Sequence, residues 1–126
     1  MKQVIHAAFD LALADIADHG DKLHLVSQAP ATYADVLLYS LGLVALTVGD
    51  GNGSYTIQDG AVSGRRLTVA DLTVPGTANG VATHVVIVDS ANEVIKAVTT
   101  APNYNMQEGV NQSVPGYDVW EIQDPT

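Results

Sequence analysis

The fold is decided by residues 83–98, THVVIVDSANEVIKAV. Two arms rich in β-branched residues flank the short polar loop Ser90-Ala91-Asn92, and this pattern predicts a β-hairpin. The first arm is almost wholly apolar between His84 and Asp89, as is typical of a central strand that is covered on both faces. We therefore expect this strand to lie under a second sheet or under a helix.

On both sides of this hairpin the chain reads as short β segments separated by turn sequences. The turn signals are Ala29-Pro30, Gly49-Asp50-Gly51-Asn52-Gly53, Asp59-Gly60, Pro75-Gly76, Asn79-Gly80 and Pro115-Gly116. Between them we predict strands at residues 23–27, within 36–48, and at 55–58, 65–71, 81–89, 93–99 and 112–123. Short strands at this spacing are typical of a two-layer β-sandwich or a small barrel, and the spacing does not separate the two.

The first residues follow a different period. Apolar side chains recur at spacings of three and four, at Val4, Ile5, Ala8, Phe9, Ala12, Leu13 and Ile16. This stripe predicts one amphipathic helix over residues 2–18, ended by Gly20 in the left-handed cap conformation. No second helix is evident. We expect a mainly β single domain over residues 1–126, with a sandwich over 23–124 and one N-terminal helix.

Composition limits the partners of the chain. The 126 residues include five Lys or Arg and fourteen Asp or Glu, which gives a formal charge of −9. Because so few cations cannot neutralise a run of phosphates, nucleic acids and anionic membranes are poor partners. The longest apolar stretch, residues 36–48, is shorter than the roughly 20 residues that a membrane span needs. The N-terminus lacks the apolar centre of a signal peptide, so we expect synthesis in the cytoplasm.

No pattern of catalytic or metal-binding residues is evident. The stretch from Asp50 to Ser54 resembles the opening of a calcium loop, but Tyr55 and Ala61 stand where glycine and a bidentate Glu are needed. The four histidines, at positions 6, 19, 24 and 84, show no metal-ligand spacing. Residues 60–64, GAVSG, precede two arginines but lack the Gly-Lys-Ser/Thr of a phosphate loop. We predict no catalytic residue, no cofactor and no metal.

Four residues are candidate partner contacts. Arg65 and Arg66 form the only cationic cluster in the sequence, and alternation along a strand directs them to opposite faces. They are interpreted either as anchors for an acidic partner or as internal ion pairs. Tyr55 and Tyr104 are candidate exposed aromatics for a carbohydrate or receptor, whereas Trp120 is expected to pack in the core or to close the sandwich against the helix.

Four segments carry a family resemblance. They are SQAPATY at 27–33, DGAVSGRRLTV at 59–69, GVATHVVIVD at 80–89 and DVWEIQDP at 118–125. In order and spacing they resemble small virion-associated proteins encoded among the structural genes of tailed bacteriophages and prophages. The resemblance spans nearly the whole chain, and residues 36–48 and 100–109 depart from it.

The resemblance implies a non-enzymatic structural protein in the phage particle. The lead hypothesis is a head decoration or cement protein that binds the major capsid protein lattice, where symmetry multiplies a weak contact. A neck, tail or fibre-attachment protein is the alternative within the virion, and a carbohydrate- or receptor-binding β module is the alternative from another class. We expect trimers or lattice-dependent assembly, because the apolar stretch 36–48 is suited to burial between subunits.

Overall fold

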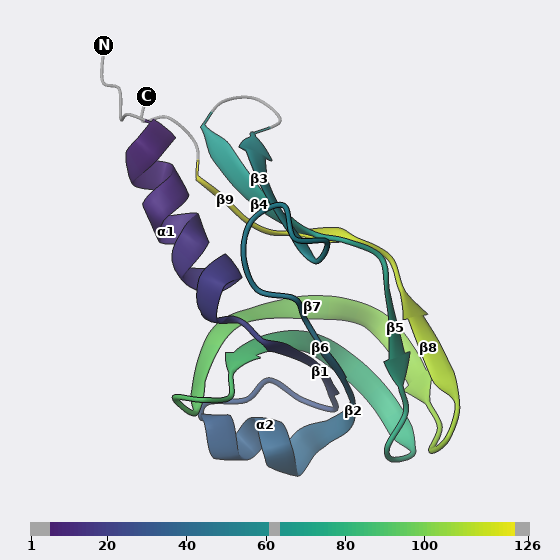
Figure 1. The fold of residues 1–126 in the computed structure, drawn as a ribbon. Coiled ribbons are helices and arrows are strands. Elements are labelled where there is room, and N and C mark those ends of the chain that lie inside the picture. Colours follow the sequence, from purple (N-terminus) through teal and green to yellow (C-terminus); the bar gives the residue numbers. More distant parts are fainter. Residues whose placement is uncertain (1–5, 61–63, 123–126) are drawn as a thin grey trace.

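The computed structural model describes residues 6–60 and 64–122. The described chain is mainly β, with two short helices (Figure 1). In order, its elements are α1 (His6–His19), β1 (Lys22–Val26), α2 (Tyr33–Tyr39), β2 (Ser40–Ala45), β3 (Tyr55–Asp59), β4 (Arg65–Val69), β5 (Leu72–Pro75), β6 (Gly80–Asp89), β7 (Val94–Met106), β8 (Asn111–Val114) and β9 (Tyr117–Ile122). The predicted mainly β class with an N-terminal helix is confirmed.

The first layer is a four-stranded antiparallel sheet, called the main sheet here, with the strand order β2-β1-β6-β7. The predicted hairpin is present as β6 and β7, which pair from Gly80 with Met106 to Asp89 with Val94. Strand β6 lies between β1 and β7, and its residues 85–89 are all buried. The apolar arm is therefore a central strand covered on both faces, as its sequence predicts.

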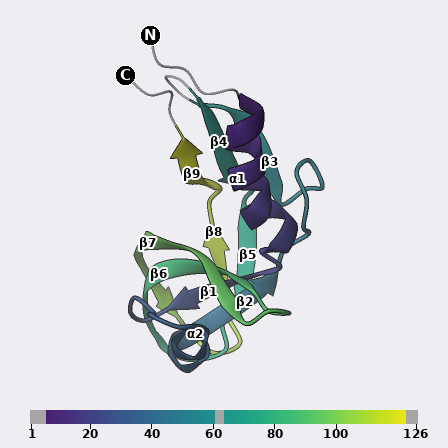
Figure 2. The ribbon, with the colours of Figure 1, turned by 90° about the vertical axis from the view of Figure 1, so that its left-hand side faces the viewer.

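The second layer consists of the sheet β3-β4-β9 and the sheet β5-β8. The two sheets are consecutive parts of one bent ribbon, because β4 leads into β5 through Ala70 and Asp71 while β8 leads into β9 through Pro115 and Gly116. The ribbon crosses the main sheet in both views (Figures 1 and 2). None of the sheets in the described part closes on itself, so the structure is a layered one and the small-barrel alternative is excluded.

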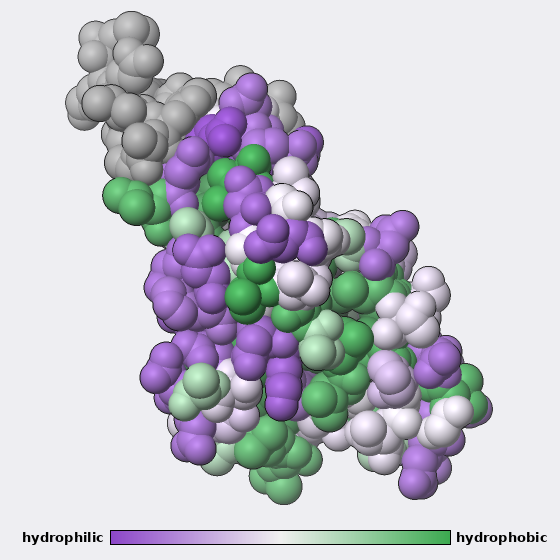
Figure 3. Space-filling view, viewed as in Figure 1, coloured by the Kyte–Doolittle hydropathy of each residue, from purple (hydrophilic) through white to green (hydrophobic). Residues whose placement is uncertain are grey.

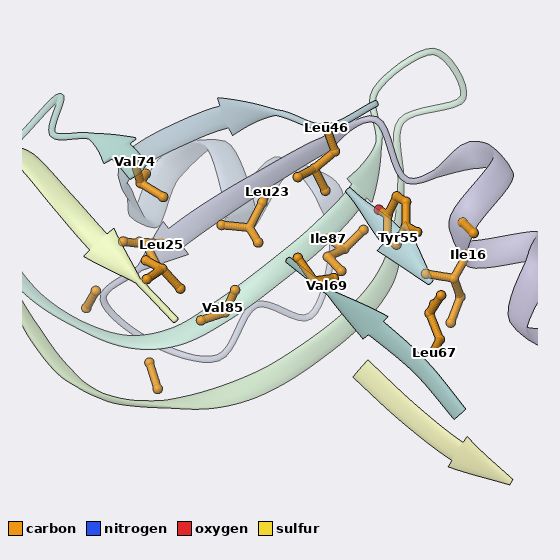
Figure 4. Close-up of a cluster of buried hydrophobic side chains, with 14 of the residues drawn as sticks. Ile16, Leu23, Leu25, Leu46, Tyr55, Leu67, Val69, Val74, Val85 and Ile87 are labelled. Atoms are coloured by element: carbon orange, nitrogen blue, oxygen red, sulfur yellow. The ribbon is translucent and has the colours of Figure 1, made fainter. Parts of the chain in front are cut away.

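The main core fills the space between these layers and α1 (Figure 4). It joins Leu23, Leu25, Val85 and Ile87 of the main sheet to Leu67, Val69, Val74 and Val114 of the second layer and to Leu13, Ile16 and Ala17 of α1. Burial of each large apolar side chain contributes roughly 1.5–3 kcal/mol to folding. This cluster is therefore what holds the two layers together.

Helix α2 covers the other face of the main sheet. Its Val36 packs with Val26 of β1 and with Val86 and Val88 of β6 in a second, smaller core. The expectation of a single helix is therefore wrong. The apolar stretch 36–48 is divided between the end of α2 and β2, because the chain turns to an extended conformation at Ser40.

The N-terminal helix ends one residue beyond the predicted limit, at His19, and its predicted start at residues 2–5 lies outside the described residues. The predicted reason for Gly20 is wrong, since its φ is not positive. A Cβ atom at Gly20 would lie 2.5 Å from Cγ2 of Ile87 and 2.6 Å from the hydroxyl of Tyr55. Glycine is required there because α1 closely approaches the main sheet.

The other strand predictions differ from the structure mainly at turns. The predicted strand 65–71 ends at Val69 and is followed by β5, which was not expected. The predicted strand 112–123 is two strands, β8 and β9, with a bend at Pro115 and Gly116, and residue 123 lies outside the described part. The second predicted arm of the hairpin, 93–99, is longer and extends to Met106.

The two long edges of the layered structure differ in how the two layers meet there. Along one edge, β2 meets β5, with a β-bridge between Gly42 and Gly76 and a hydrogen bond of 2.9 Å from the Thr77 N–H to the Leu41 carbonyl. Along the other edge lie β7 and β9, and neither pairs with a further strand within residues 6–60 and 64–122. The layers are thus joined by backbone hydrogen bonds on the β2 side, whereas on the β7 side they meet through side chains such as Thr99 and Tyr117, without strand pairing between β7 and β9.

Candidate functional site

The outer face of α2 is an exposed apolar surface, called the α2 face here. Leu38 is 75% exposed and Leu37 is 55% exposed, and Ala34 is exposed beside them. Because Val36 on the opposite face of the helix is buried, α2 is apolar on both faces, a pattern typical of a helix covered on both sides. Hydrophobic side chains protrude over α2 at the lower end of the molecule (Figure 3).

The α2 face also lacks charge. From residue 23 to residue 49 the chain carries only one formally charged side chain, Asp35. Its carboxylate accepts hydrogen bonds from the N–H groups of Ala31 (3.1 Å) and Thr32 (3.3 Å), while the Thr32 hydroxyl accepts one from the Asp35 N–H (3.3 Å). This capping box stabilises the start of the helix, and it engages the carboxylate of Asp35 in hydrogen bonds. In a chain of charge −9, the segment that contains α2 therefore carries a single negative charge.

Arg65 forms two ion pairs with acids of its own chain. Its Nε donates to Asp10 of α1 and its Nη1 donates to Asp59 of β3, each at 2.8 Å. Hydrogen bonds to these two carboxylates raise the pKa of Arg65, so the group is a permanent cation between two acids. Of the two interpretations of this residue, the structure supports the internal ion pair, and Arg65 serves to fix α1 on the β3–β4 hairpin.

Arg66 points to the other face, as alternation predicts. Its Nη1 lies 3.4 Å from the Asp118 carboxylate on β9, and its side chain is 30% exposed. Lys96 on β7 likewise pairs with Asp15 of α1 at 3.1 Å. These cations connect elements of the fold, so the described chain offers a partner mainly its acids and its apolar surfaces.

The aromatic candidates are placed differently from their predictions. Tyr55 is buried among core side chains (Figure 4). Its hydroxyl donates a hydrogen bond of 2.6 Å to the Gly20 carbonyl. Burial raises the pKa of Tyr55 above its usual range. The prediction of an exposed aromatic at position 55 is therefore wrong. Tyr104 is half-buried and packs against the main core.

Trp120 is not a core residue, because 46% of it is exposed. It lines a hollow of about 380 Å³ between α1, β7 and β9, together with Asp15, Lys96, Val98 and Val119. We call this the tryptophan hollow. The expectation that Trp120 fills the core is wrong, although the residue does lie beside the helix.

A second hollow lies farther along the same pair of strands. It has a volume of about 200 Å³ and is lined mainly by apolar atoms of β7 and of the bend between β8 and β9. Thr99, Ala101, Tyr104, Pro115 and Tyr117 are among its lining residues, and burial raises the pKa of Tyr117. We call this the tyrosine hollow. Both hollows open on the side where no backbone pairing joins β7 to β9.

In the calcium-like loop, residues 50–54, the polar side chains of Asp50 and Asn52 form hydrogen bonds with the backbone of the chain. The Asp50 carboxylate accepts from the Ile57 N–H at 2.8 Å, and the Asn52 amide donates to the Val48 carbonyl at 2.8 Å. The Gly60 N–H donates to the Gly64 carbonyl at 3.0 Å at the end of the β3–β4 hairpin, while residues 61–63 of the predicted phosphate-like loop lie outside the described part. The loop from Asp50 to Ser54 therefore acts as a turn held by its own hydrogen bonds.

The histidines do not come together as a metal site. His24 is buried with Nδ1 2.8 Å from the Ser40 hydroxyl, His84 has Nδ1 2.8 Å from the Thr83 hydroxyl, and His19 lies exposed at the end of α1. Among the described residues there is no group of three His, Asp or Glu side chains placed to hold a metal ion. The side chain of His6 lies outside the described part.

Two carboxylates hold the β6–β7 turn. Asp21 accepts from the Ser90 N–H at 2.9 Å and from its hydroxyl at 2.5 Å. Partial burial acts to raise the pKa of Asp21, but the bonds from Ser90 outweigh it and the pKa is lowered. Asp89 accepts from the Asn92 amide at 2.8 Å, which lowers the pKa of Asp89. Both acids are structural anions that shape the hairpin.

Neither α1 nor α2, the helices of the described part, has the length and apolar character of a membrane span. Comparisons with protein families, with curated proteins and with solved structures give no match. The candidate site is therefore defined by this chain alone: the α2 face at one end, and two hollows along β7 and β9.

Proposed function

We propose that the chain is a non-enzymatic structural protein of a tailed bacteriophage particle, and specifically a head decoration protein that binds the major capsid protein lattice. The segments at 27–33, 59–69, 80–89 and 118–125 support the virion assignment through their resemblance to small phage structural proteins. The proposed role is binding to protein, and no cofactor is part of it.

The observation that carries the proposal is the α2 face. An exposed pair of leucines on a helix whose other face is already buried is costly in water, and contact with a protein surface removes that cost. The face lies at the opposite end of the molecule from the first turn of α1 and the end of β9 (Figures 1 and 2). A small apolar contact of this kind is weak singly and becomes durable when it repeats over a symmetric lattice.

The acidic balance supports the same role. Of the fourteen acids, only Asp35 lies in the segment 23–49 that contains α2, so the α2 face can approach another surface with little like-charge repulsion. Attachment through α2 directs the acidic remainder of the chain outward. Trimers, or assembly that depends on the lattice, remain part of the proposal.

The first experiment is to measure copy number. Quantitative mass spectrometry of purified particles of the phage that encodes this chain gives its ratio to the major capsid protein. A ratio near one, or a fixed fraction set by lattice symmetry, supports the decoration role. A handful of copies per particle favours a neck, tail or fibre-attachment protein, and absence from the particle rejects a virion role.

A variant tests the α2 face directly. Leu37→Ser together with Leu38→Ser is expected to lower binding to purified capsids at least tenfold, while the circular dichroism spectrum stays unchanged. The matched control is Val110→Ser, since Val110 is also about half exposed but lies between β7 and β8. Equal binding by both variants would show that attachment uses another surface.

A receptor- or carbohydrate-binding module is the weaker alternative. Its two candidate aromatics are not exposed at loop tips, because Tyr55 is buried and Tyr104 packs on the core. Binding to a glycan array that survives the α2 substitutions would favour it over the decoration role.

A further inference from the structure

Strand β7 leaves a regular backbone edge unpaired. Its pairing with β6 is continuous from Ala97 to Thr100, because the two irregularities in the ladder lie on either side of that stretch. In an antiparallel strand every second residue directs both its N–H and its C=O to the same edge. The stretch 97–100 therefore presents donors and acceptors that no strand of the described chain uses.

The chain closes the corresponding edge on the opposite side. There, β2 is bridged to β5 through Gly42 and Gly76, so no strand can be added between the layers. On the β7 side, Lys96 and Pro102 flank the regular stretch, and these are residue types that block pairing at strand edges. The unblocked edge is thus restricted to a short length, which suits one short added segment better than sheet-to-sheet aggregation.

The two hollows lie along the same stretch. The tryptophan hollow contacts β7 at residues 96–98, and the tyrosine hollow contacts it at 99–102 and 104. On the second layer they contact β9 at 119 and 120 and the β8–β9 bend at 114–117. A strand placed beside β7 passes one hollow and then the other. Side chains at alternate positions of that strand point to one face, so apolar residues there can enter both hollows.

The charge of the chain selects among such segments. Arg65, Arg66 and Lys96 are each paired with an acid, and the formal charge of the whole chain is −9. The net charge gives the whole chain a negative long-range field that attracts a basic segment, while Asp15 and Lys96 balance each other in the lining of the hollows.

We propose that the open side between β7 and β9 binds an extended, basic segment of another protein, which adds a strand to β7 and places alternate apolar side chains in the two hollows. The backbone edge supplies hydrogen bonds, and the hollows select the side chains, as in other cases of strand addition. The proposal is independent of the virion role, because it concerns the isolated chain and a different surface from α2.

The test uses a capped nine-residue peptide of alternating lysine and valine, added to the purified full chain. Trp120 is the only tryptophan, so its fluorescence reports directly on the open side. We expect saturable binding with a change in Trp120 emission, and slower amide hydrogen exchange confined to β7 between Ala97 and Thr100. Two control peptides have the same length: one alternates glutamate and valine, and one carries N-methyl groups on alternate backbone nitrogens. Each should bind at least tenfold more weakly.

A matched pair of variants tests the site. Thr99 pairs with the core residue Val85, lines the tyrosine hollow and is half-buried, so Thr99→Lys and Thr99→Glu disturb the strand similarly while differing in charge. The lysine variant should bind the basic peptide at least fivefold more weakly than the glutamate variant.

Three outcomes would overturn the proposal. Failure of the lysine–valine peptide to bind at millimolar concentration rejects a peptide site. Equal binding by the N-methylated peptide shows that no strand is added. The third outcome is measured without peptide. If amide exchange in β7 becomes slower as the protein concentration rises, a second copy of the chain fills the open side. None of these outcomes bears on copy number in the particle, so the two proposals fail separately.

Discussion

At the residue scale, His24 is a buried histidine whose surroundings disfavour its protonated form. It is buried on the main sheet, with Nδ1 beside the Ser40 hydroxyl, and its Nε2 has no hydrogen-bond partner among the described residues. Burial, and to a lesser extent the charge of Lys22, lowers the pKa of His24. A proton on this ring would place an unpaired charge in the core.

The first prediction follows from this lowered pKa. The pKa of a histidine in an unfolded chain is about 6.5, which is higher than the pKa of His24 in the folded chain. The unfolded state therefore binds the proton more readily. The free energy of unfolding should therefore fall as the pH drops below about 6.5, and His24→Gln should remove that dependence. Urea denaturation at several pH values measures it. The control is the exposed His19→Gln, and an unchanged slope in His24→Gln would refute the assignment.

Asp21 and Asp89 affect stability in a more acidic pH range than His24 does. Asp21 and Asp89 have lowered pKa values in the folded chain, so the stability that they contribute is lost only at more acidic pH, below about 4. The effect of His24 is therefore measurable without interference from them.

Side-chain direction at single residues was the least predictable feature of the sequence. The sequence predicts that Tyr55 begins a strand, but it does not show which face of that strand the side chain occupies; pairing with the buried Val69 places it toward the core. Trp120 is expected in the core or against the helix. Alternation from Tyr117 and Val119, which pack on the core, directs it outward, whereas its pairing with the buried Leu67 directs it inward, because the register shifts beside this pair.

At the scale of elements, the attachment of α1 depends on Arg65 as well as on its apolar face. Arg65→Met keeps much of the side-chain volume and removes both ion pairs, with Asp10 and with Asp59. Since the partners are partly exposed, we expect a loss of only about 1 kcal/mol. Hydrogen exchange should become faster in α1 than in the main sheet.

The matched variant is Arg66→Met, which removes an ion pair with β9 and leaves α1 untouched. It should not accelerate exchange in α1. If Arg65→Met leaves stability unchanged but abolishes binding to capsids, Arg65 is a partner anchor instead.

Helix α2 depends on its capping box. Thr32→Ala removes the acceptor for the Asp35 N–H and should destabilise the chain by about 1 kcal/mol. Because α2 carries the exposed leucines, the same change should weaken capsid binding by disordering the α2 face. Thermal unfolding and a capsid pull-down measure the two effects. Thr77→Ala, at an exposed threonine outside any helix, is the control and should change neither.

The elements show where sequence reasoning succeeds and where it fails. The hairpin of β6 and β7 was predictable because period, length and turn chemistry agree over residues 83–98. Helix α2 was missed because Val36, Leu37 and Leu38 lie in a continuous apolar run that reads as strand. Thr32 followed three residues later by Asp35 was the available signal. Strand β5 was missed because its four residues end in Pro75, which usually argues against a strand.

At the scale of the whole molecule, the sequence does not predict that the layers are bridged at the β2 edge and unpaired at the β7 edge. The sequence predicts two layers from the number and spacing of strands, but which edges meet depends on pairs far apart in the chain, such as Gly42 with Gly76. The two hollows were unpredictable for the same reason, because they form between strands β7 and β9, which are brought together only by folding. The apolar character of 36–48 was readable from sequence, whereas its division into a covered strand and an exposed helix face was not.

The last prediction concerns the closed edge. A Cβ atom at Gly42 would lie 2.7 Å from the Pro75 carbonyl oxygen, which is backbone and cannot move aside as a flexible side chain can. Gly42→Ala must therefore push β5 away from β2 and should cost about 1–3 kcal/mol. The amide of Thr77, which donates to Leu41 across this edge, should exchange faster, while amides of β7 should not. Ala45→Val, at an exposed position of the same strand, is the control for added volume. Unchanged stability in Gly42→Ala would mean that the β2–β5 contact does not hold the layers together, and that the apolar core alone does so.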